Sequence, residues 1–94
     1  MAKQTKLNLG NIVDIMHASA LKVRLATALA KNLPVVLVAD KVEKVDTAGL
    51  QMIYGFIQQV KENGDTVHWQ KPSDILIQMS ELLGVFDSLS LVRN

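Results

Sequence analysis

The stretch Val45-Asp46-Thr47-Ala48-Gly49-Leu50 joins an apolar run on its N-terminal side to a helical pattern on its C-terminal side. The run is Val35-Val36-Leu37-Val38-Ala39, which is apolar on both faces and therefore predicts a central strand. A short charged connection, Asp40 to Lys44, separates the two. Asp46 is a favoured N-cap residue, because its carboxylate accepts hydrogen bonds from unpaired amides of the first helical turn. The stretch therefore predicts a strand-to-helix corner.

Two residues make this corner a candidate functional site. Thr47 places a hydroxyl at the positive end of the helix, where a phosphoryl group can be accepted or removed. Gly49 is expected to leave the surface of the first turn bare, so that another protein could approach closely. The plain alternative is that Asp46 and Thr47 only cap the helix, and loss of such a cap costs about 1 kcal/mol.

The composition predicts a single globular domain over residues 1–94, with 49% hydrophobic and 20% charged residues. The formal net charge is +1, the ten Lys and Arg residues are scattered, and aromatics make up 4%, which argues against a nucleic-acid partner. The chain has no cysteine, which excludes disulfides, thiolate metal ligands and a cysteine nucleophile. No apolar run reaches membrane-spanning length, and Met1 to Lys6 lacks a signal-peptide core. We therefore expect a cytoplasmic protein with no direct membrane insertion.

The patterns along the chain predict alternating strands and helices. We expect a strand at 3–9, a short apolar piece at 12–15 that could be a second strand, and a helix from about 18 that stops at Pro34. After the strand at 35–39 come a helix at 47–63 with an Asn63-Gly64 cap, a strand at 65–70, and a helix between Ser73 and Gly84. Alternation of this kind predicts a largely parallel sheet in an α/β fold.

Helical spacing predicts which side chains form the core. The expected buried stripes are Leu21, Leu25, Ala28 and Leu29 in the first helix, Leu50, Ile53, Ile57 and Val60 in the second, and Ile75 or Leu76 with Met79, Leu82 and Leu83 in the third. The tail from Phe86 to Val92 is apolar enough to pack, although it has no clear period. Trp69 is expected to pack in the core.

The sequence offers little support for catalysis. It contains no phosphate-binding glycine loop, no dinucleotide fingerprint and no HExxH zinc motif. His17 and His68 are predicted to be surface or half-buried residues. Asp40 and Glu43 belong to a short solvated loop that lacks the regular oxygen ligands of a metal site. We therefore expect no enzyme activity, no metal and no cofactor.

The outer face of the second helix is a second candidate for partner binding. Its residues Gln51, Met52, Gly55, Gln58 and Gln59 carry no charge, although charge is plentiful elsewhere in the chain. An uncharged strip with Met and Gln beside Thr47 suits a protein partner. An ordinary solvated helix face is the alternative, and the residues do not decide between the two. The predicted docking set is Asp46, Thr47, Ala48, Gly49, Leu50, Gln51, Met52, Gly55, Gln58 and Gln59.

The run at 35–38 followed by Val45 to Leu50 resembles the signature of the STAS domain, the family of bacterial anti-anti-sigma factors, stressosome proteins and cytoplasmic tails of sulfate transporters. The resemblance extends over most of the chain. Upstream it includes Leu9-Gly10, Asp14 and Ala18 to Leu21; downstream it includes Val67-His68-Trp69, Pro72-Ser73 and Leu82-Leu83-Gly84. This second half resembles short free-standing members associated with chemotaxis-type signalling.

The resemblance implies a sheet of four or five strands packed by about four helices, and a bacterial switch protein rather than an enzyme. In anti-sigma factor antagonists a kinase phosphorylates a Ser or Thr two places after the Asp, and that position here is Ala48, which has no hydroxyl. In stressosome-type members the acceptor can directly follow the Asp, which makes Thr47 the phosphoacceptor candidate. A lipid-asymmetry transporter subunit also resembles this stretch, and there the corner contacts the ATPase.

Three functional hypotheses follow. The first is a signalling module whose corner docks a kinase-like, anti-sigma or chemotaxis-type partner. The second is an accessory subunit of an ABC-type lipid transporter that contacts its ATPase. The third is a nucleotide or small-molecule binder with an anion at the start of the second helix. No glycine-rich loop supports the third, and Asp46 would repel a phosphate unless its carboxylate caps inward. The sequence leaves the oligomeric state open.

Overall fold

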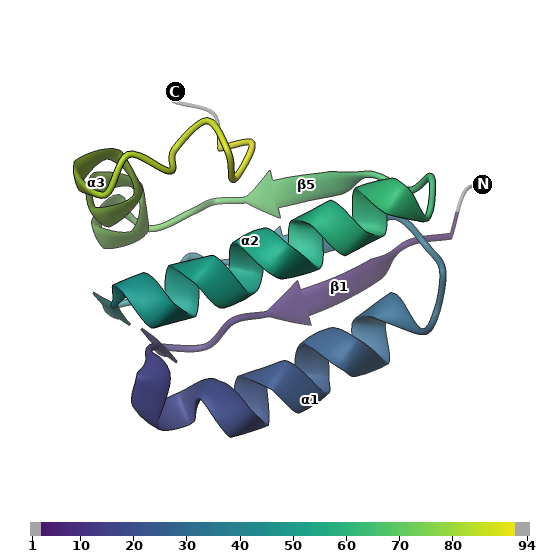
Figure 1. Cartoon of the computed structure of the whole chain (residues 1–94), viewed down its shortest axis with the longest axis horizontal. Coiled ribbons are helices and arrows are strands. Elements are labelled where there is room, and N and C mark those ends of the chain that lie inside the picture. Colours follow the sequence, from purple (N-terminus) through teal and green to yellow (C-terminus); the bar gives the residue numbers. More distant parts are fainter. Residues whose placement is uncertain (1–2, 92–94) are drawn as a thin grey trace.

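A computed structural model describes residues 3–91 of the chain. Strands β1 (Thr5–Asn8), β3 (Val35–Val38) and β5 (Val67–Gln70) form a parallel sheet with β3 in the centre (Figure 1). Two shorter strands, β2 (Ile12–Val13) and β4 (Lys44–Val45), form a separate parallel pair beyond the C-terminal ends of β1 and β3. The predicted α/β fold is confirmed, and so is the central position of the 35–38 run.

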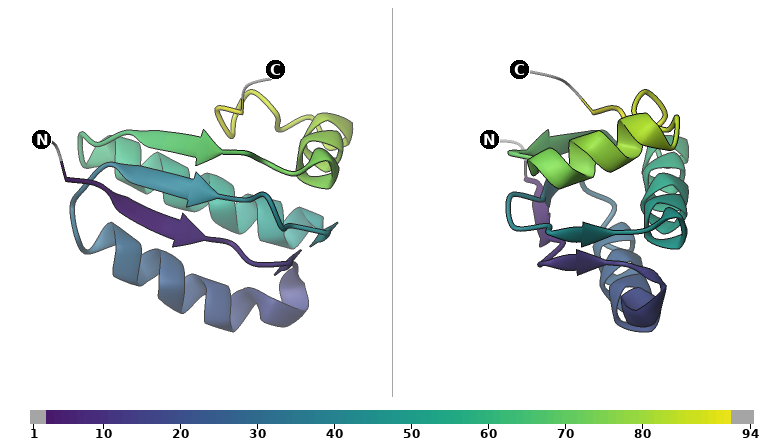
Figure 2. Two further views of the ribbon diagram at one scale, coloured as in Figure 1. Left: turned by 180° about the vertical axis from the view of Figure 1, so that it is seen from behind. Right: turned by 90° about the vertical axis from the view of Figure 1, so that its left-hand side faces the viewer.

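The helices are α1 (Ala18–Leu29), α2 (Thr47–Glu62) and α3 (Asp74–Leu82), with a short 3₁₀ helix, η1 (Ile15–His17), before α1. Helices α1 and α2 lie side by side on one face of the three-stranded sheet (Figures 1 and 2). Seen from behind in Figure 2, no described helix covers the opposite face of that sheet. Helix α3 lies beyond the C-terminal end of β5, near the start of α2.

The predicted strand at 12–15 is shorter than the sequence pattern suggested. It ends at Val13 because Asp14 caps η1, with its Oδ1 accepting a hydrogen bond from the amide of His17 at 3.1 Å. A capped turn stops the extended backbone that the apolar residues alone would favour. The exposed side chain of Ile15, which the pattern placed in a strand, therefore belongs to η1.

The core stripes of the first two helices are confirmed. Leu21, Leu25 and Ala28 of α1 are buried and Leu29 packs against the core, while all four predicted residues of α2 are buried together with Phe56. Both helices thus place their apolar stripe against β1, β3 and β5. Asn63 caps α2 at its C-terminus as predicted, and Gly64 follows with a φ of 84°.

The prediction for α3 is partly wrong. Leu76 is buried and Met79 packs against the core, but Leu82 is 78% exposed and Leu83 is 38% exposed. Helix α3 buries the side that carries Leu76 and Ser80, and Leu82 points away from that side. Leu83 is the C-cap residue, where the helix ends before it can return to the core.

The segment after α3 packs as predicted. Leu89 and Leu91 are buried, and Trp69 packs partly against the core while its Nε1 donates a hydrogen bond to the Leu89 carbonyl at 2.8 Å. Trp69 therefore fixes the position of this segment beside β5. Val92 lies outside the described residues.

Candidate protein-docking site

Asp46 organises the strand-to-helix corner with its two carboxylate oxygens. Its backbone is extended, with φ −127° and ψ 174°, and Oδ1 accepts a hydrogen bond from the amide of Gly49 at 2.8 Å. Its Oδ2 accepts a hydrogen bond from the amide of Ile15 at 3.0 Å. The N-cap prediction is confirmed. The tie to Ile15 was not predicted, because the two residues are 31 positions apart and no local pattern connects them.

Gly49 corrects one expectation about the corner. The residue is buried, and a Cβ added to it would meet the carbonyl oxygen of Val13 in β2. The Val13 carbonyl is held in place, since it accepts a hydrogen bond from the amide of Asp46 at 3.1 Å. The prediction that Gly49 leaves a bare surface for a partner is therefore wrong, because β2 of the same chain makes the close approach.

Thr47 lies at the mouth of an apolar pocket of about 300 Å³. Its side chain is exposed, whereas Ala48 is half-buried and Leu50 is only 2% exposed. The pocket lies between the start of α2 and the segment that follows α3, and its lining residues are Thr47, Leu50, Gln51, Tyr54, Leu83, Val85 and Ser88. Leu50 therefore forms part of the pocket wall while it remains buried.

Several exposed apolar residues belong to the corner or are chain neighbours of its residues. Six large hydrophobic residues are exposed among those described, and two of them line the pocket with Thr47. Ile15 is bonded to Asp46 through its amide, and Tyr54 and Leu83 share the pocket with Thr47. Met16 and Leu82 are chain neighbours of these residues and are 83% and 78% exposed. We call this set the corner surface, which consists of Ile15, Met16, Thr47, Gln51, Tyr54, Leu82 and Leu83.

Asp14 stabilises the part of the corner surface that η1 provides. Its side chain is buried, and Oδ1 lies 2.7 Å from His17 Nδ1 while Oδ2 lies 3.8 Å from Lys44 Nζ. The hydrogen bond from the His17 side chain holds the pKa of Asp14 below its ordinary value, against the opposing effect of burial. Asp14 was not predicted as a site residue, although Asp is a favoured N-cap residue and its position before a helix could have indicated it.

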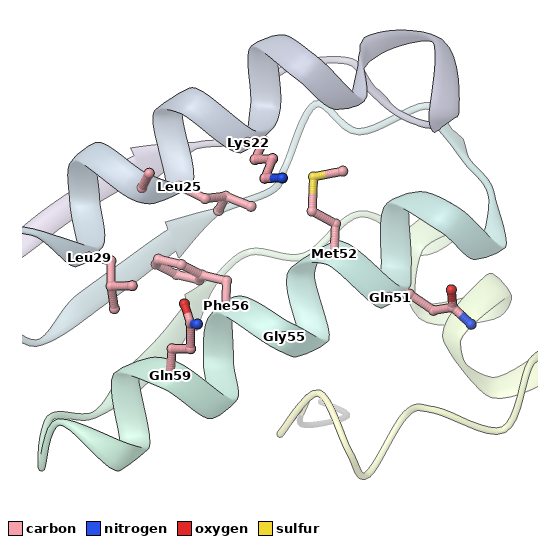
Figure 3. A pocket seen from close by; sticks show the side chains of 9 residues that line it. Lys22, Leu25, Leu29, Gln51, Met52, Gly55, Phe56 and Gln59 are labelled. Atoms are coloured by element: carbon pink, nitrogen blue, oxygen red, sulfur yellow. The ribbon is translucent and has the colours of Figure 1, made fainter.

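The predicted outer face of α2 divides into two surfaces. Met52, Gly55 and Gln59 line a groove between α1 and α2, whereas Gln51 points away from α1 (Figure 3). Gln51 lies on the ridge between them, since it borders both the groove and the pocket at Thr47. Gln58 is half-buried and lines neither hollow.

The family model described as "Mlab, STAS domain" matches residues 2–93. The chain belongs to this STAS family. A solved structure that is similar to the domain is the NMR structure of the protein TM1081, with a TM-score of 0.74 and 18% identity over 95% of this chain and 73% of that chain. At this identity the likeness shows the fold alone. No curated protein matches the chain.

The resemblance drawn from residues 35–50 is therefore confirmed at the level of the family. STAS domains are in general regulatory modules that bind other proteins and are not enzymes. In this STAS domain, no group of three His, Cys, Asp or Glu side chains within residues 3–91 could hold a metal ion. His17 and His68 are exposed, as predicted, and so are the loop residues Asp40 and Glu43. None of the helices in the described part of the chain is long and apolar enough to cross a membrane.

The start of α2 offers a poor site for a bound phosphate. The inward-facing carboxylate of Asp46 already accepts the hydrogen bond of the Gly49 amide. A phosphate would have to compete with this carboxylate for the amides of the first turn. The same geometry leaves the Thr47 hydroxyl on the solvent side of the corner, since the Thr47 side chain is exposed.

Proposed function

We propose that this STAS domain, residues 1–94, is a cytoplasmic bacterial regulatory module that docks a signalling protein through the corner surface. The partner would be a kinase-like, anti-sigma or chemotaxis-type protein. The observation that carries the proposal is the apolar pocket beside Thr47, where the exposed side chains of Tyr54 and Leu83 lie next to an exposed threonine. An apolar hollow lined by exposed hydrophobic side chains is typical of an interaction site.

Thr47 gives this surface a means of control. Its side chain borders the apolar pocket together with Leu50, Tyr54 and Val85. A phosphoryl group on the hydroxyl would add close to two negative charges at the mouth of that pocket. A partner that buries an apolar side chain there would have to desolvate those charges, which opposes binding. Phosphorylation of Thr47 would therefore release the partner.

The test is a pull-down from the native cell with wild type, Thr47→Glu and Thr27→Glu, read by mass spectrometry that also measures phosphate on Thr47. Thr27 is exposed on α1, far from the corner, and supplies the matched control. We expect a partner that wild type and Thr27→Glu retain and Thr47→Glu loses. Identical partners for all three proteins, with no phosphate on Thr47, would contradict the switch.

A second candidate is an accessory subunit of an ABC-type lipid transporter that contacts its ATPase. The position of a Thr directly after Asp46, with Ala48 where antagonists carry the acceptor, favours it. In this case Thr47 would be a contact residue with no phosphate. Co-purification separates the two candidates, because a transporter ATPase and a histidine-kinase complex differ plainly in mass and composition.

A further inference from the structure

The groove between α1 and α2 adjoins the corner surface at Gln51 and has a volume of about 300 Å³. Its apolar walls are Leu25 and Leu29 of α1 and Met52 and Phe56 of α2, which point toward one another in Figure 3. Gly55 lies along the α2 side of the groove. The groove runs from Met52 to Gln59, which corresponds to about two turns of helix.

Gly55 has no role within the described chain that explains it. The residue lies inside α2, where Gly is less favourable than Ala by about 1 kcal/mol. A Cβ added to it would have no neighbour within 4 Å, and its φ is not in the left-handed region. At Gly49 in the same helix, by contrast, the Val13 backbone leaves no room for a side chain. A bare backbone beside an apolar groove allows another chain to approach α2 closely.

The charges around the groove favour an acidic occupant. No acidic residue occurs from Ile15 to Ala39, and the first one in α2 is Glu62 at its last turn. Lys22 lines the groove and points across it toward Met52 (Figure 3). Neither Lys22 nor Arg24 forms an ion pair with any residue from 3 to 91. The cation at the groove is therefore available to a carboxylate from outside.

We propose that this groove binds an acidic amphipathic helix of a protein partner, which goes beyond the docking at Thr47. The apolar side chains of the partner, at helical spacing, would pack on Leu29 and Met52, the partly buried apolar residues of the groove. Its backbone would approach α2 at Gly55, and a carboxylate at the edge of its apolar stripe would pair with Lys22. A partner held at both surfaces would gain avidity without any new contact at the corner.

The test uses a photoreactive benzoylphenylalanine in place of Gln59, which is exposed and lines the groove. Cells that make the protein are irradiated, and the crosslinked peptides are sequenced by mass spectrometry. We expect a segment of another protein with net negative charge and apolar residues at three- and four-residue spacing. Lys22→Glu should lower the crosslink yield about fivefold or more, because attraction at the rim becomes repulsion.

Two further variants distinguish a specific loss of binding at the groove from a general folding defect. Arg24→Glu makes the same charge change on the other flank of α1, beside Thr27, and should leave the yield unchanged. Gly55→Leu places a side chain into the open groove and should abolish the crosslink while the melting temperature stays at or above that of wild type. A basic or neutral crosslinked segment, a second copy of this chain, an absent crosslink, or equal effects of Lys22→Glu and Arg24→Glu would each overturn the proposal.

The same variants show whether binding at the groove is independent of docking at the corner surface. Thr47→Glu should leave a short peptide of the crosslinked segment bound at the groove, because Thr47 does not line it. Titration of that synthetic peptide into the labelled domain should shift the amide signals of Ala26 and Gly55. Equal loss of peptide binding by Thr47→Glu and Lys22→Glu would show a single surface and overturn the separate groove.

Discussion

The two glycines of α2 lie six residues apart and have different surroundings. Gly49 is buried against the backbone of β2, where a methyl group would meet the Val13 carbonyl. Gly55 is exposed, and a methyl group there would meet nothing within 4 Å. The first glycine is required by the fold of this chain, and the second is free of any such requirement. The structural role of a glycine in a helix therefore depends on which atoms lie where its side chain would be.

The largest expected effect in this comparison is that of Gly49→Ala. The added methyl must displace the Val13 carbonyl, which also accepts the hydrogen bond of the Asp46 amide. We expect the free energy of unfolding to fall by about 3 kcal/mol, since overpacking a well-packed contact outweighs the better helix propensity of Ala. Urea denaturation followed by circular dichroism measures the loss. If Gly49→Ala is as stable as the wild type, β2 can shift to accommodate the methyl group without an energetic cost.

The next effect is that of Asp46→Ala, which tests what holds β2, η1 and α2 together. The substitution removes the cap on the Gly49 amide and the tie to the Ile15 amide. We expect a loss of about 2 kcal/mol, since an N-cap is worth about 1 kcal/mol and a second hydrogen bond adds a similar amount. Denaturant midpoints provide the measurement.

Asp46→Asn is the matched control for the loss of the two hydrogen bonds. Its amide retains one acceptor oxygen, so it can preserve the cap on Gly49 while losing the tie to Ile15. We expect about half the destabilisation of Asp46→Ala. If both variants lose the same free energy of unfolding, the charge of the carboxylate stabilises the corner and the pair of hydrogen bonds does not.

Much of the fold could be predicted from local patterns. The apolar run at 35–39 indicated the central strand, and helical spacing indicated the buried stripe from Leu50 to Val60. These features depend on periodicity, which neighbouring residues determine. Helix α3 was less predictable, because its nine residues are too few for the period to show whether Leu82 or Leu83 returns to the core.

The site was predictable only in part, because its decisive contacts join distant segments. Asp46 and Thr47 were found from capping chemistry. The burial of Gly49 depends on Val13, 36 positions earlier, and the tie from Asp46 reaches Ile15. The apolar residues that share the pocket with Thr47 likewise come from distant segments, α2 and the chain from Leu83 onward. A single sequence carries no local signal for such contacts.

The opposite sign is expected for Gly55→Ala. The methyl group enters open space, so only the helix propensity changes, and the free energy of unfolding should rise by about 1 kcal/mol. Thermal melting shows this as a higher midpoint. Gly49→Ala, measured in parallel, is the control for the same chemical change at a buried position. A lower midpoint for Gly55→Ala would mean that α2 needs a glycine there for a reason within the fold.

The smallest effect concerns Asp14, which directly follows β2 and caps η1. The hydrogen bond from His17 holds the pKa of the Asp14 carboxyl below its ordinary value of 3.8. A lowered pKa in the folded state means that the charged carboxylate stabilises the fold above the unfolded-state pKa, and that this contribution is lost as the pH falls through the folded-state pKa. Stability of the wild type should therefore decline from about pH 5 downward.

Asp14→Asn should flatten that decline, because the side chain can no longer titrate. It should also lower stability near pH 6, since the ion pair with Lys44 at 3.8 Å and the charged acceptor for His17 are lost. Asp40→Asn, in the exposed loop, serves as the control and should keep the wild-type slope. The measurement is the urea midpoint of each protein from pH 3 to pH 7. If Asp14→Asn and Asp40→Asn change the slope equally, Asp14 does not carry the acid sensitivity of the corner.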